Sequence, residues 1–348
     1  MTGYLRRIGW LTAFSILLLL VAAVVVVLEI IPANAYVILP GEAVPVEPMI
    51  KIQGQSISKS SGNLYMTDVS YYKANHLLEQ LYGELNPDAD IEQVQTFSGG
   101  LSQSQYVQYN SDLMVGSIQQ AEAAALSAAR GYKPHYLQLG PQVVFVLPHT
   151  PAAALLRPGD IIKEVNGMPV HTTRSVAPLV RRTTPGGIVH LVVSRNGHIL
   201  QFAVRTVPSS NGRLDPKGKT ALIGIDMQDQ VKLKLPIKIS ISVGNIGGPS
   251  AGLMFTLGII ERLQHQDLTH GCKVAGTGTI DVSGKVGEIG GAKQKIIAAR
   301  NAGARYFLVP DVLDNLNPAR AHRGNVTVVP IQTLKQALTF LHGLKPCH

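Results

Sequence analysis

The amino-acid sequence predicts an α+β protein of several parts: an N-terminal transmembrane helix, a β-rich module in the middle and an α/β domain near the C-terminus. Three observations carry this prediction. An uncharged apolar run lies near the N-terminus, two Asn-Gly pairs join apolar segments in the middle, and a period-two segment at 236–243 precedes a long apolar helix. A chain of 348 residues is long enough for two or three domains.

The apolar run covers residues 8–28, which are 21 residues without a charge. At about 1.5 Å per residue, such a helix reaches roughly 31 Å, the thickness of the hydrocarbon core of a bilayer. Arg6 and Arg7 precede the run, and no further Lys or Arg occurs before Lys51. The positive-inside rule therefore predicts a single-pass protein of the cell membrane, with a cytoplasmic N-terminus and the remaining domains outside the cytoplasm.

A cleaved signal peptide is the alternative interpretation of the N-terminus. Ala33-Asn34-Ala35 fits a small-x-small cleavage pattern, although the apolar run is longer than the usual signal-peptide core of about 7–15 residues. The anchor is the preferred interpretation, and cleavage after Ala35 stays open. The sequence also leaves open whether its two cysteines, Cys272 and Cys347, form a disulfide.

The composition argues against several classes of protein. Hydrophobic residues make up 45% and charged residues 15% of the chain, which is unlike a disordered protein. The net charge of +9 is spread along the chain and only 5% of residues are aromatic, so nucleic acid is not expected as a partner. A basic surface of this kind is compatible with anionic lipid headgroups, and a lipid bilayer is the expected partner.

The sequence predicts no metal site and no cofactor. It contains no CxxC pair and no HExxH motif among its 11 histidines. His265 and His270 follow the apolar helix at a spacing that suits a solvated loop better than a metal site. Gly218-Lys219-Thr220 ends like a phosphate-binding loop, but its distance from Gly212 is one residue more than a Walker A loop allows.

Five segments are predicted along the chain. They are a cytoplasmic tip and anchor (1–35), an extracytoplasmic α/β region (36–116), the β-rich module (117–207), a polar linker (208–220) and the terminal α/β domain (221–345). In the second segment we expect a strand at 64–69 and a helix at 70–85, and the polar stretch 88–113 has no assigned chemical role. A helix is expected at 117–130, where alanine is frequent.

The middle module combines short strands with turns. Residues 143–146 form an apolar strand, and Asn166-Gly167 and Asn196-Gly197 are signals of tight hairpins. With Pro151-Ala152-Ala153 and Arg157-Pro158-Gly159-Asp160-Ile161-Ile162, this order resembles a PDZ domain of the bacterial protease type, over about 90 residues. The resemblance implies capture of extended segments or C-termini of peptides at a sheet edge. Pro178 interrupts the expected groove helix, and a β-rich packing module that binds no peptide is the alternative.

A candidate nucleophile follows the period-two strand. Pro249-Ser250-Ala251-Gly252 opens an apolar helix, and proline is common at the first helical position. Ser250 therefore lies at a helix N-terminus, where N–H groups lack partners, and the N–H groups around Gly248 to Ala251 can stabilise an oxyanion. Gly247 and Gly248 would let a substrate backbone approach closely. A simple N-cap is the common alternative for such a serine.

A candidate base lies on a second helix, predicted to begin after Gly291 and to end at Gly303. At about 100° per residue, Lys295 falls on a face of small apolar residues, whereas Lys293 falls on a polar, solvated face. The small residues are Ala298, Ala299 and Ala302, and the polar ones are Gln294, Arg300 and Asn301. Burial and the helix N-terminus favour a neutral Lys295 amine, which can accept the proton of Ser250. A lysine stem that snorkels to solvent is the alternative.

Both motifs resemble those of the Lon protease domain, over about 125 residues from 222 to 344. Gly248-Pro249-Ser250-Ala251-Gly252 is similar to its nucleophile motif, and Thr277-Gly278-Thr279-Ile280, Gly284-Lys285-Val286 and 289–295 are similar to its lysine motif. The resemblance implies Ser250 as nucleophile, Lys295 as base and Thr277 as a supporting residue that hydrogen-bonds the lysine. Relatives with an ATPase often have an acidic residue where this chain has Gly247.

The whole arrangement resembles the bacterial membrane-anchored PDZ-Lon proteases, which have no ATPase. This implies an ATP-independent serine endopeptidase that cleaves unfolded or flexible polypeptides outside the cytoplasm, and a homo-oligomer such as a hexamer. Two alternatives stay open. One is a membrane-tethered peptide-binding adaptor with an inactive protease fold, and the other is a Ser-His hydrolase, because residues 248–252 also fit Gly-x-Ser-x-Gly.

Overall fold

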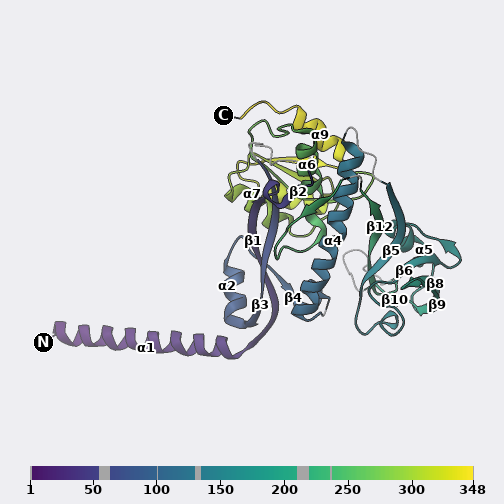
Figure 1. Cartoon of the computed structure of the whole chain (residues 1–348). Helices are drawn as coiled ribbons and strands as arrows, with labels where there is room; N and C mark the ends of the chain where they lie inside the picture. The colour runs from purple at the N-terminus through teal and green to yellow at the C-terminus, as the bar shows by residue number, and fades with distance from the viewer. Residues whose placement is uncertain are drawn as a thin grey trace.

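The computed structural model describes residues 2–54, 63–99, 101–129, 135–209, 219–235 and 237–347. A mixed α/β body lies at the end of a long N-terminal helix, with a β-rich module on one side of it (Figure 1). The predicted mixed, multidomain class is therefore confirmed. Most of the linker predicted at 208–220 lies outside the described residues.

Helix α1 (Thr2–Ile30) contains the predicted apolar run. Its segment Ala13–Ile30 has a mean hydropathy of 2.9, and none of that segment is buried against the rest of the protein. In Figure 1, α1 extends away from the body. A long apolar helix that the rest of the protein does not bury fits either a membrane anchor or a signal sequence.

A six-stranded sheet in the order β18-β17-β14-β3-β1-β4 forms the centre of the body. Its strands are β1 (Pro32–Pro45), β3 (Leu64–His76), β4 (Asp90–Gln93), β14 (Val274–Gly276), β17 (Tyr306–Pro310) and β18 (Thr327–Ile331). β1 is antiparallel to β3 and β4, whereas β3, β14, β17 and β18 run parallel. The region predicted at 36–116 and the terminal domain therefore share one sheet.

The same two regions also pack through helices and short strands. β2 (Ile50–Ile52) pairs with β13 (Ile239–Ile241), and α4 (Gln103–Ala128) packs on α6 (Gly252–Gln264) around a common apolar core. α4 runs through residue 117, where the sequence predicts a domain boundary. The other elements of the body are α2 (Leu77–Leu85), α3 (Val94–Ser98), β15 (Thr279–Ile280), β16 (Val286–Gly287), α7 (Ala292–Asn301), α8 (Leu313–Ala321) and α9 (Leu334–His342).

Two predicted elements have different bounds in the structure. The strand expected at 64–69 continues to His76, so the helix expected at 70–85 is wrong in its first half. Pairing with β1 keeps this stretch extended, and its two adjacent tyrosines favour a strand. The helix expected at 117–130 begins much earlier, at Gln103, where the side chains of Ser102 and Gln105 form a capping box.

The β-rich module has a sheet in the order β12-β5-β6-β8-β9, and β7 pairs with β6. Its elements are β5 (His135–Val146), η2 (Pro151–Ala154), β6 (Ile161–Val165), β7 (Met168–Pro169), α5 (Thr173–Val180), β8 (Ile188–Arg195), β9 (His198–Arg205), the pair β10 (Val207–Pro208) and β11 (Ala221–Leu222), and β12 (Ile225–Lys234). The two predicted Asn-Gly hairpins are confirmed, with positive φ at all four residues. β12 pairs along the whole length of β5.

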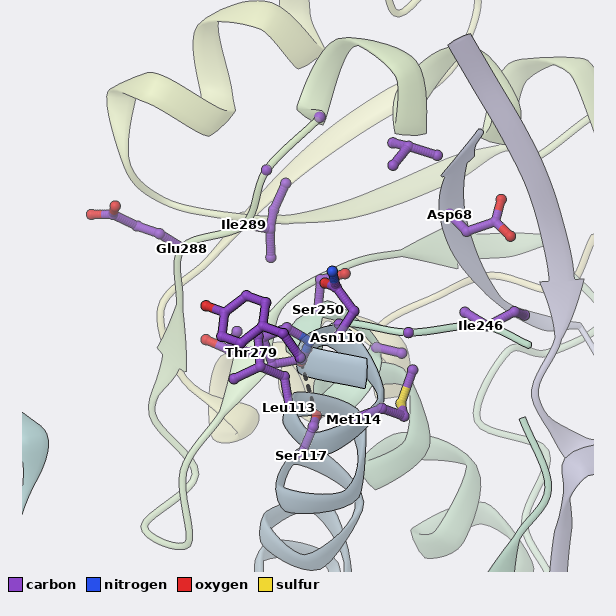
Figure 2. A pocket seen from close by; sticks show the side chains of 18 of the residues that line it. Asp68, Asn110, Leu113, Met114, Ser117, Ile246, Ser250, Thr279, Glu288 and Ile289 are labelled. Atoms are coloured by element: carbon purple, nitrogen blue, oxygen red, sulfur yellow. Dashed lines mark hydrogen bonds between the residues drawn. The ribbon is translucent and has the colours of Figure 1, made fainter. Parts of the chain in front are cut away.

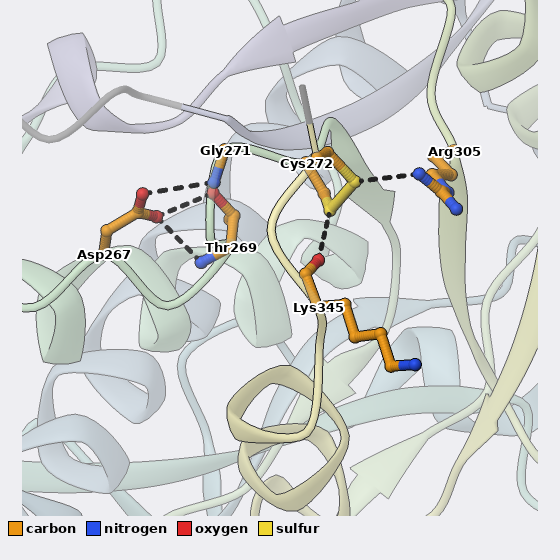
Figure 3. Close-up of a disulfide and its surroundings, with 7 residues drawn as sticks. Asp267, Thr269, Gly271, Cys272, Arg305 and Lys345 are labelled. Carbon is orange, nitrogen blue, oxygen red and sulfur yellow. Dashed lines mark hydrogen bonds between the residues drawn. A yellow bond between two sulfur atoms is a disulfide. The ribbon is translucent and has the colours of Figure 1, made fainter.

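A disulfide joins Cys272 to Cys347, which are 75 residues apart. It ties the C-terminal tail to the segment between α6 and β14, and Figure 3 shows it beside Arg305 and Lys345. The Nη1 group of Arg305 donates to Cys347 Sγ at 3.2 Å. The pairing that the sequence left open is thus present in the structure.

Removal of this disulfide should lower thermal stability. A cross-link that closes a loop of 75 residues restricts the unfolded chain, which is worth about 4 kcal/mol in the chain-entropy treatment. We therefore expect Cys347→Ser to lower the Tm by several degrees in a thermal melt without reductant. Dithiothreitol should lower the Tm of the unmodified protein equally and leave that of the variant unchanged. Equal Tm values for the two oxidised proteins would contradict the expectation.

Candidate active site

Ser250 lies in a 3₁₀ turn, Pro249–Ala251, that leads directly into α6. The preceding residue, Gly248, has a φ of 88° and a ψ of 157°, a conformation that side chains disfavour. The Ser250 carbonyl accepts hydrogen bonds from the N–H of Gly278 at 2.7 Å and from the hydroxyl of Thr277 at 3.1 Å. These bonds fix the main chain at the serine.

Helix α4 holds the same loop from another side. The Asn110 carbonyl accepts the N–H of Gly248 at 2.8 Å, and the Ser117 hydroxyl donates to the Pro249 carbonyl at 2.8 Å. Figure 2 shows Asn110 and Ser117 projecting from this helix, with Asn110 beside Ser250. The nucleophile turn is therefore positioned by a helix that neither predicted motif contains.

The two glycines before the turn have structural roles. The N–H of Gly248 is already bonded to Asn110, which corrects the expectation that it binds an oxyanion. At Gly247 a Cβ atom would lie 2.8 Å from the Cβ of Asn110, so glycine allows the loop to approach α4. The main-chain N–H groups of Ser250 and Ala251, in the first helical turn, are the candidate oxyanion donors.

Helix α7 brings Lys295 to the serine. Gly291, the residue before this helix, has a left-handed conformation (φ 68°). The side chain of Lys295 is buried, with 4% exposed, and its Nζ lies 2.8 Å from Ser250 Oγ. Burial lowers the pKa of Lys295 to about 7, while the negative charge of Asp68 acts in the opposite direction. The structure thus brings together the two side chains that the sequence selected.

This pair has the chemistry of a nucleophile and its base. With a pKa of about 7, a large share of Lys295 is a neutral amine at neutral pH. The amine lone pair can accept the Ser250 proton, whereas the ammonium form can only donate to Oγ. A lysine in this state therefore has the chemistry of a proton acceptor for a serine hydroxyl.

Thr277 is fully buried, and its hydroxyl donates to the main-chain carbonyl of Ser250. The resemblance implies a hydrogen bond from this residue to the lysine instead. The observed bond supports the serine main chain, so Thr277 lies next to Ser250 and has a different partner from the one that the resemblance implies.

Helical periodicity predicts a solvated face for Lys293, but the structure places this lysine against the start of β4. Its Nζ donates to Asp90 Oδ1 at 2.8 Å and to the Ala89 carbonyl at 2.9 Å, and the amide of Gln294 donates to Asp90 Oδ2 at 2.7 Å. The start of β4 covers this side of α7, which local periodicity cannot reveal. The two lysines of the motif therefore have separate partners, and Lys295 alone contacts the serine.

Ser250 and Lys295 line a cleft of about 1030 Å³ between the body and the β-rich module. One wall is aromatic: the ring centroids of Tyr71 and Phe97 are 5.0 Å apart, those of Phe97 and Tyr106 are 5.0 Å apart, and Tyr109 follows at 6.4 Å from Tyr106. Such a wall suits apolar side chains of a bound chain. In Figure 2, Asp68 and Glu288 lie on opposite sides of the labelled residues.

Residues 88–113 contribute to this site, although the sequence gives them no predicted role. Phe97, Tyr106, Tyr109 and Asn110 all come from that stretch and line the cleft. One local signal was available, because Asn110, Leu113 and Ser117 have the spacing of one helix face. That spacing identifies a face but not the loop against which it packs.

The alternatives that rest on histidine find no support at the site. None of the described residues that line the cleft is a histidine, so a Ser-His hydrolase would lack its base there. His265 is exposed and ends α6 in a left-handed conformation, as expected for a loop position. Within the described parts of the chain, no group of three or more His, Cys, Asp or Glu residues could hold a metal ion.

Comparison with known protein families identifies two parts of the chain. The family described as "Lon protease (S16) C-terminal proteolytic domain" matches residues 218–341, and the PDZ domain family matches residues 117–206. The chain carries a Lon-type proteolytic domain and a PDZ domain. Both predicted resemblances are thereby confirmed, and residues 1–116, which complete the Lon-type sheet and one wall of the cleft, lie outside both matches.

Known relatives of the Lon-type domain are Lon proteases. That of Neorickettsia sennetsu is 34% identical over 101 residues, which are 28% of this chain and 12% of the relative. The archaeal Lon protease of Archaeoglobus fulgidus is 23% identical over 190 residues, 52% of this chain and 28% of the relative. The chain thus spans less than a third of the length of either relative.

Solved structures similar to this chain include PDZ domains. That of an SdrC-like protein from Listeria monocytogenes is 22% identical, with a TM-score of 0.23, and the match covers 26% of this chain and 90% of that structure. The corresponding domain from Listeria innocua has the same identity and TM-score, with coverages of 25% and 92%.

Proposed function

We propose that this protein is an ATP-independent serine endopeptidase of the Lon type that cleaves unfolded or flexible polypeptides. The observation that carries the proposal is the 2.8 Å distance between Lys295 Nζ and Ser250 Oγ within a Lon-type domain. A buried amine with a pKa of about 7, next to a serine at a helix start, is the combination that nucleophilic catalysis requires.

The reaction proceeds in two steps. Ser250 Oγ attacks the peptide carbonyl carbon while Lys295 takes its proton, and the N–H groups of Ser250 and Ala251 stabilise the oxyanion. Lys295 then gives that proton to the departing amine nitrogen, which leaves an ester on Ser250. In the second step Lys295 takes a proton from water, the resulting hydroxide attacks the ester, and the proton returns to Ser250 Oγ.

The shape of the cleft supports extended polypeptide segments as substrates. A peptide bond can reach Ser250 only where the flanking chain lies along the cleft, next to the aromatic wall of Tyr71, Phe97, Tyr106 and Tyr109. A folded protein presents few such segments, because its backbone groups are bonded within its own structure. Reaction without nucleotide is part of the proposal because the resemblance to the PDZ-Lon proteases implies it.

The PDZ domain is proposed to gate the cleft. Peptide capture by strand addition needs a free edge of β5, but β12 of the same chain covers that edge from Ile225 to Lys234. The N–H of Thr173, at the start of α5, donates to Asp229 of β12 at 2.6 Å. Asp226 and Asp229 also line the catalytic cleft. A peptide that enters along β5 would therefore displace a strand that forms part of the cleft wall.

The cell membrane, with the catalytic part outside the cytoplasm, is the proposed location. α1 is long and apolar enough to be an anchor, and the Cys272–Cys347 disulfide suits an oxidising compartment. A homo-oligomer such as a hexamer, which the resemblance implies, is part of the same proposal.

Proteolysis by the full chain in lipid nanodiscs tests this function. Fluorescein-labelled casein should be hydrolysed without added nucleotide, and Ser250→Ala should reduce hydrolysis to the background of the assay. The matched control is Ser240→Ala, at an exposed serine of β13, which should retain activity. If Ser250→Ala and the unmodified protein behave alike, whether both active or both inactive, the peptidase proposal fails and the adaptor alternative is favoured.

A further inference from the structure

Helix α2 exposes apolar side chains on the side that faces away from the protein. Its inner side is packed against the sheet at Gly83, where a Cβ atom would lie within 2.9 Å of Val37 and Ile91 side-chain atoms. On the outer side, Leu81 is 37%, Tyr82 73% and Leu85 75% exposed. At about 100° per residue, the two leucines lie opposite Gly83. A helix on the surface of a soluble domain has the reverse arrangement, with its polar face outward.

This apolar face continues the surface of α1. The N–H of Leu77, the first residue of α2, donates to the carbonyl of Ile31, the residue that follows α1, at 2.9 Å. The two helices are in contact, and Figure 1 shows α2 at the end of α1 where the chain enters the body. Ile30 and Ile31 are exposed as well, so apolar surface runs from the end of α1 onto α2.

The composition of α2 fits the boundary between lipid and water. Tyr82 has an apolar ring with a polar hydroxyl, and such side chains concentrate at the headgroup level of bilayers. The helix carries Glu79 and Glu84 and no basic residue, so attraction to anionic lipids is not the source of binding. An apolar contact of this kind needs only a zwitterionic surface.

We propose that α2 is an interfacial helix that places Leu81, Tyr82 and Leu85 in the headgroup region of the leaflet from which α1 emerges. The inference rests on the proposed anchor and is independent of the proposed proteolysis. The lipid surface is the occupant because the patch is continuous with a helix whose apolar segment is not buried by the rest of the protein. Contact at two places, α1 and α2, would fix the orientation of the cleft relative to the bilayer.

Tryptophan fluorescence of the full chain in nanodiscs can test the contact. The chain has one tryptophan, Trp10, so Trp10→Phe provides a silent background. In that background, Tyr82→Trp places a reporter on α2 and Leu313→Trp places one on α8. Leu313 is the matched control because it is 71% exposed and α8 packs at the other edge of the sheet, on β17 and β18.

Nanodiscs of phosphatidylcholine with brominated acyl chains should quench and blue-shift the emission of the Tyr82→Trp protein and leave the Leu313→Trp protein unquenched. Adding Leu81→Ser and Leu85→Ser should reduce the quenching at Tyr82→Trp. Absence of quenching at Tyr82→Trp overturns the proposal, and a blue shift without quenching assigns the face to a second copy of the chain. A chain that is not retained in the nanodisc refutes the anchor and this contact together, whereas casein hydrolysis tests the peptidase separately.

Discussion

Lys295→Met is expected to abolish proteolysis and at the same time to stabilise the folded protein at neutral pH. Without the amine, Ser250 loses its proposed proton acceptor, and general-base catalysis is typically worth about 10²–10⁴-fold in rate. The stability gain follows from burial, which lowers the pKa of Lys295 from 10.5 to about 7. At pH 7 the Lys295 amine is fully protonated in the unfolded chain but binds its proton weakly in the folded state. This difference lowers the free energy of unfolding by about 4 kcal/mol. Methionine has similar length and carries no such cost.

The pH dependence of this gain has a definite sign. The folded pKa lies below the unfolded one, so the cost is fully present below about 7 and disappears as the pH rises through 10.5. The Tm difference between Lys295→Met and the unmodified protein should thus be largest at pH 7 or below and narrow toward pH 10. Thermal melts across this range, with casein hydrolysis at pH 8, measure both effects.

Lys293→Met is the matched control on the same helix. This lysine has an ion pair with Asp90 instead of an uncompensated buried amine, so its loss should lower the Tm or leave it unchanged. A Lys295→Met protein that retains the unmodified rate of hydrolysis would remove Lys295 from the mechanism. A Lys295→Met protein with a lower Tm than the unmodified protein at pH 7 would mean that burial of the Lys295 amine does not destabilise the folded state.

The pH profile of peptide hydrolysis is the second large effect. The base acts only as a neutral amine, so kcat/KM should rise about tenfold per pH unit below the pKa of Lys295 and level off above about 7. Asp68→Asn should move the midpoint to lower pH, because the Asp68 charge raises the pKa of Lys295. Initial rates on a fluorogenic peptide between pH 5 and 9 would measure both.

Glu288→Gln is the comparison for the Asp68 variant. Glu288 lines the cleft but is not among the groups that shift the pKa of Lys295. The pH profile of the Glu288→Gln protein should therefore have the same midpoint as that of the unmodified protein. A rate that does not change between pH 5 and 9, or a midpoint near 10, would contradict the assignment of Lys295 as the base. An unchanged midpoint in Asp68→Asn would show that the carboxylate exerts no field at the lysine.

The N-terminal region illustrates why part of the fold could not be predicted. Residues 64–69 were recognised as a strand from their local pattern, but nothing in that pattern indicates that β3 pairs in parallel with β14. The aromatic wall has the same origin, since Phe97 and Tyr106 meet Tyr71 only when α3 and α4 pack on that sheet. Pairing of distant segments depends on which edges and faces remain free after folding, and a local window carries no record of it.

The sequence by itself determined the apolar helix, the Asn-Gly hairpins, and the choice of Ser250 and Lys295. Each of these depends on neighbours within one or two turns of the chain: an uncharged run, a turn that needs positive φ, a proline before an apolar helix, and a lysine among alanines. Only the tertiary structure decided which groups surround that pair. Ser117 reaches Pro249 across 132 residues, Gln294 reaches Asp90 across 204, and β12 covers β5. Hydrogen bonds over such separations follow from the packing of the whole chain, so the periodicity of residues within one helix or strand does not predict them.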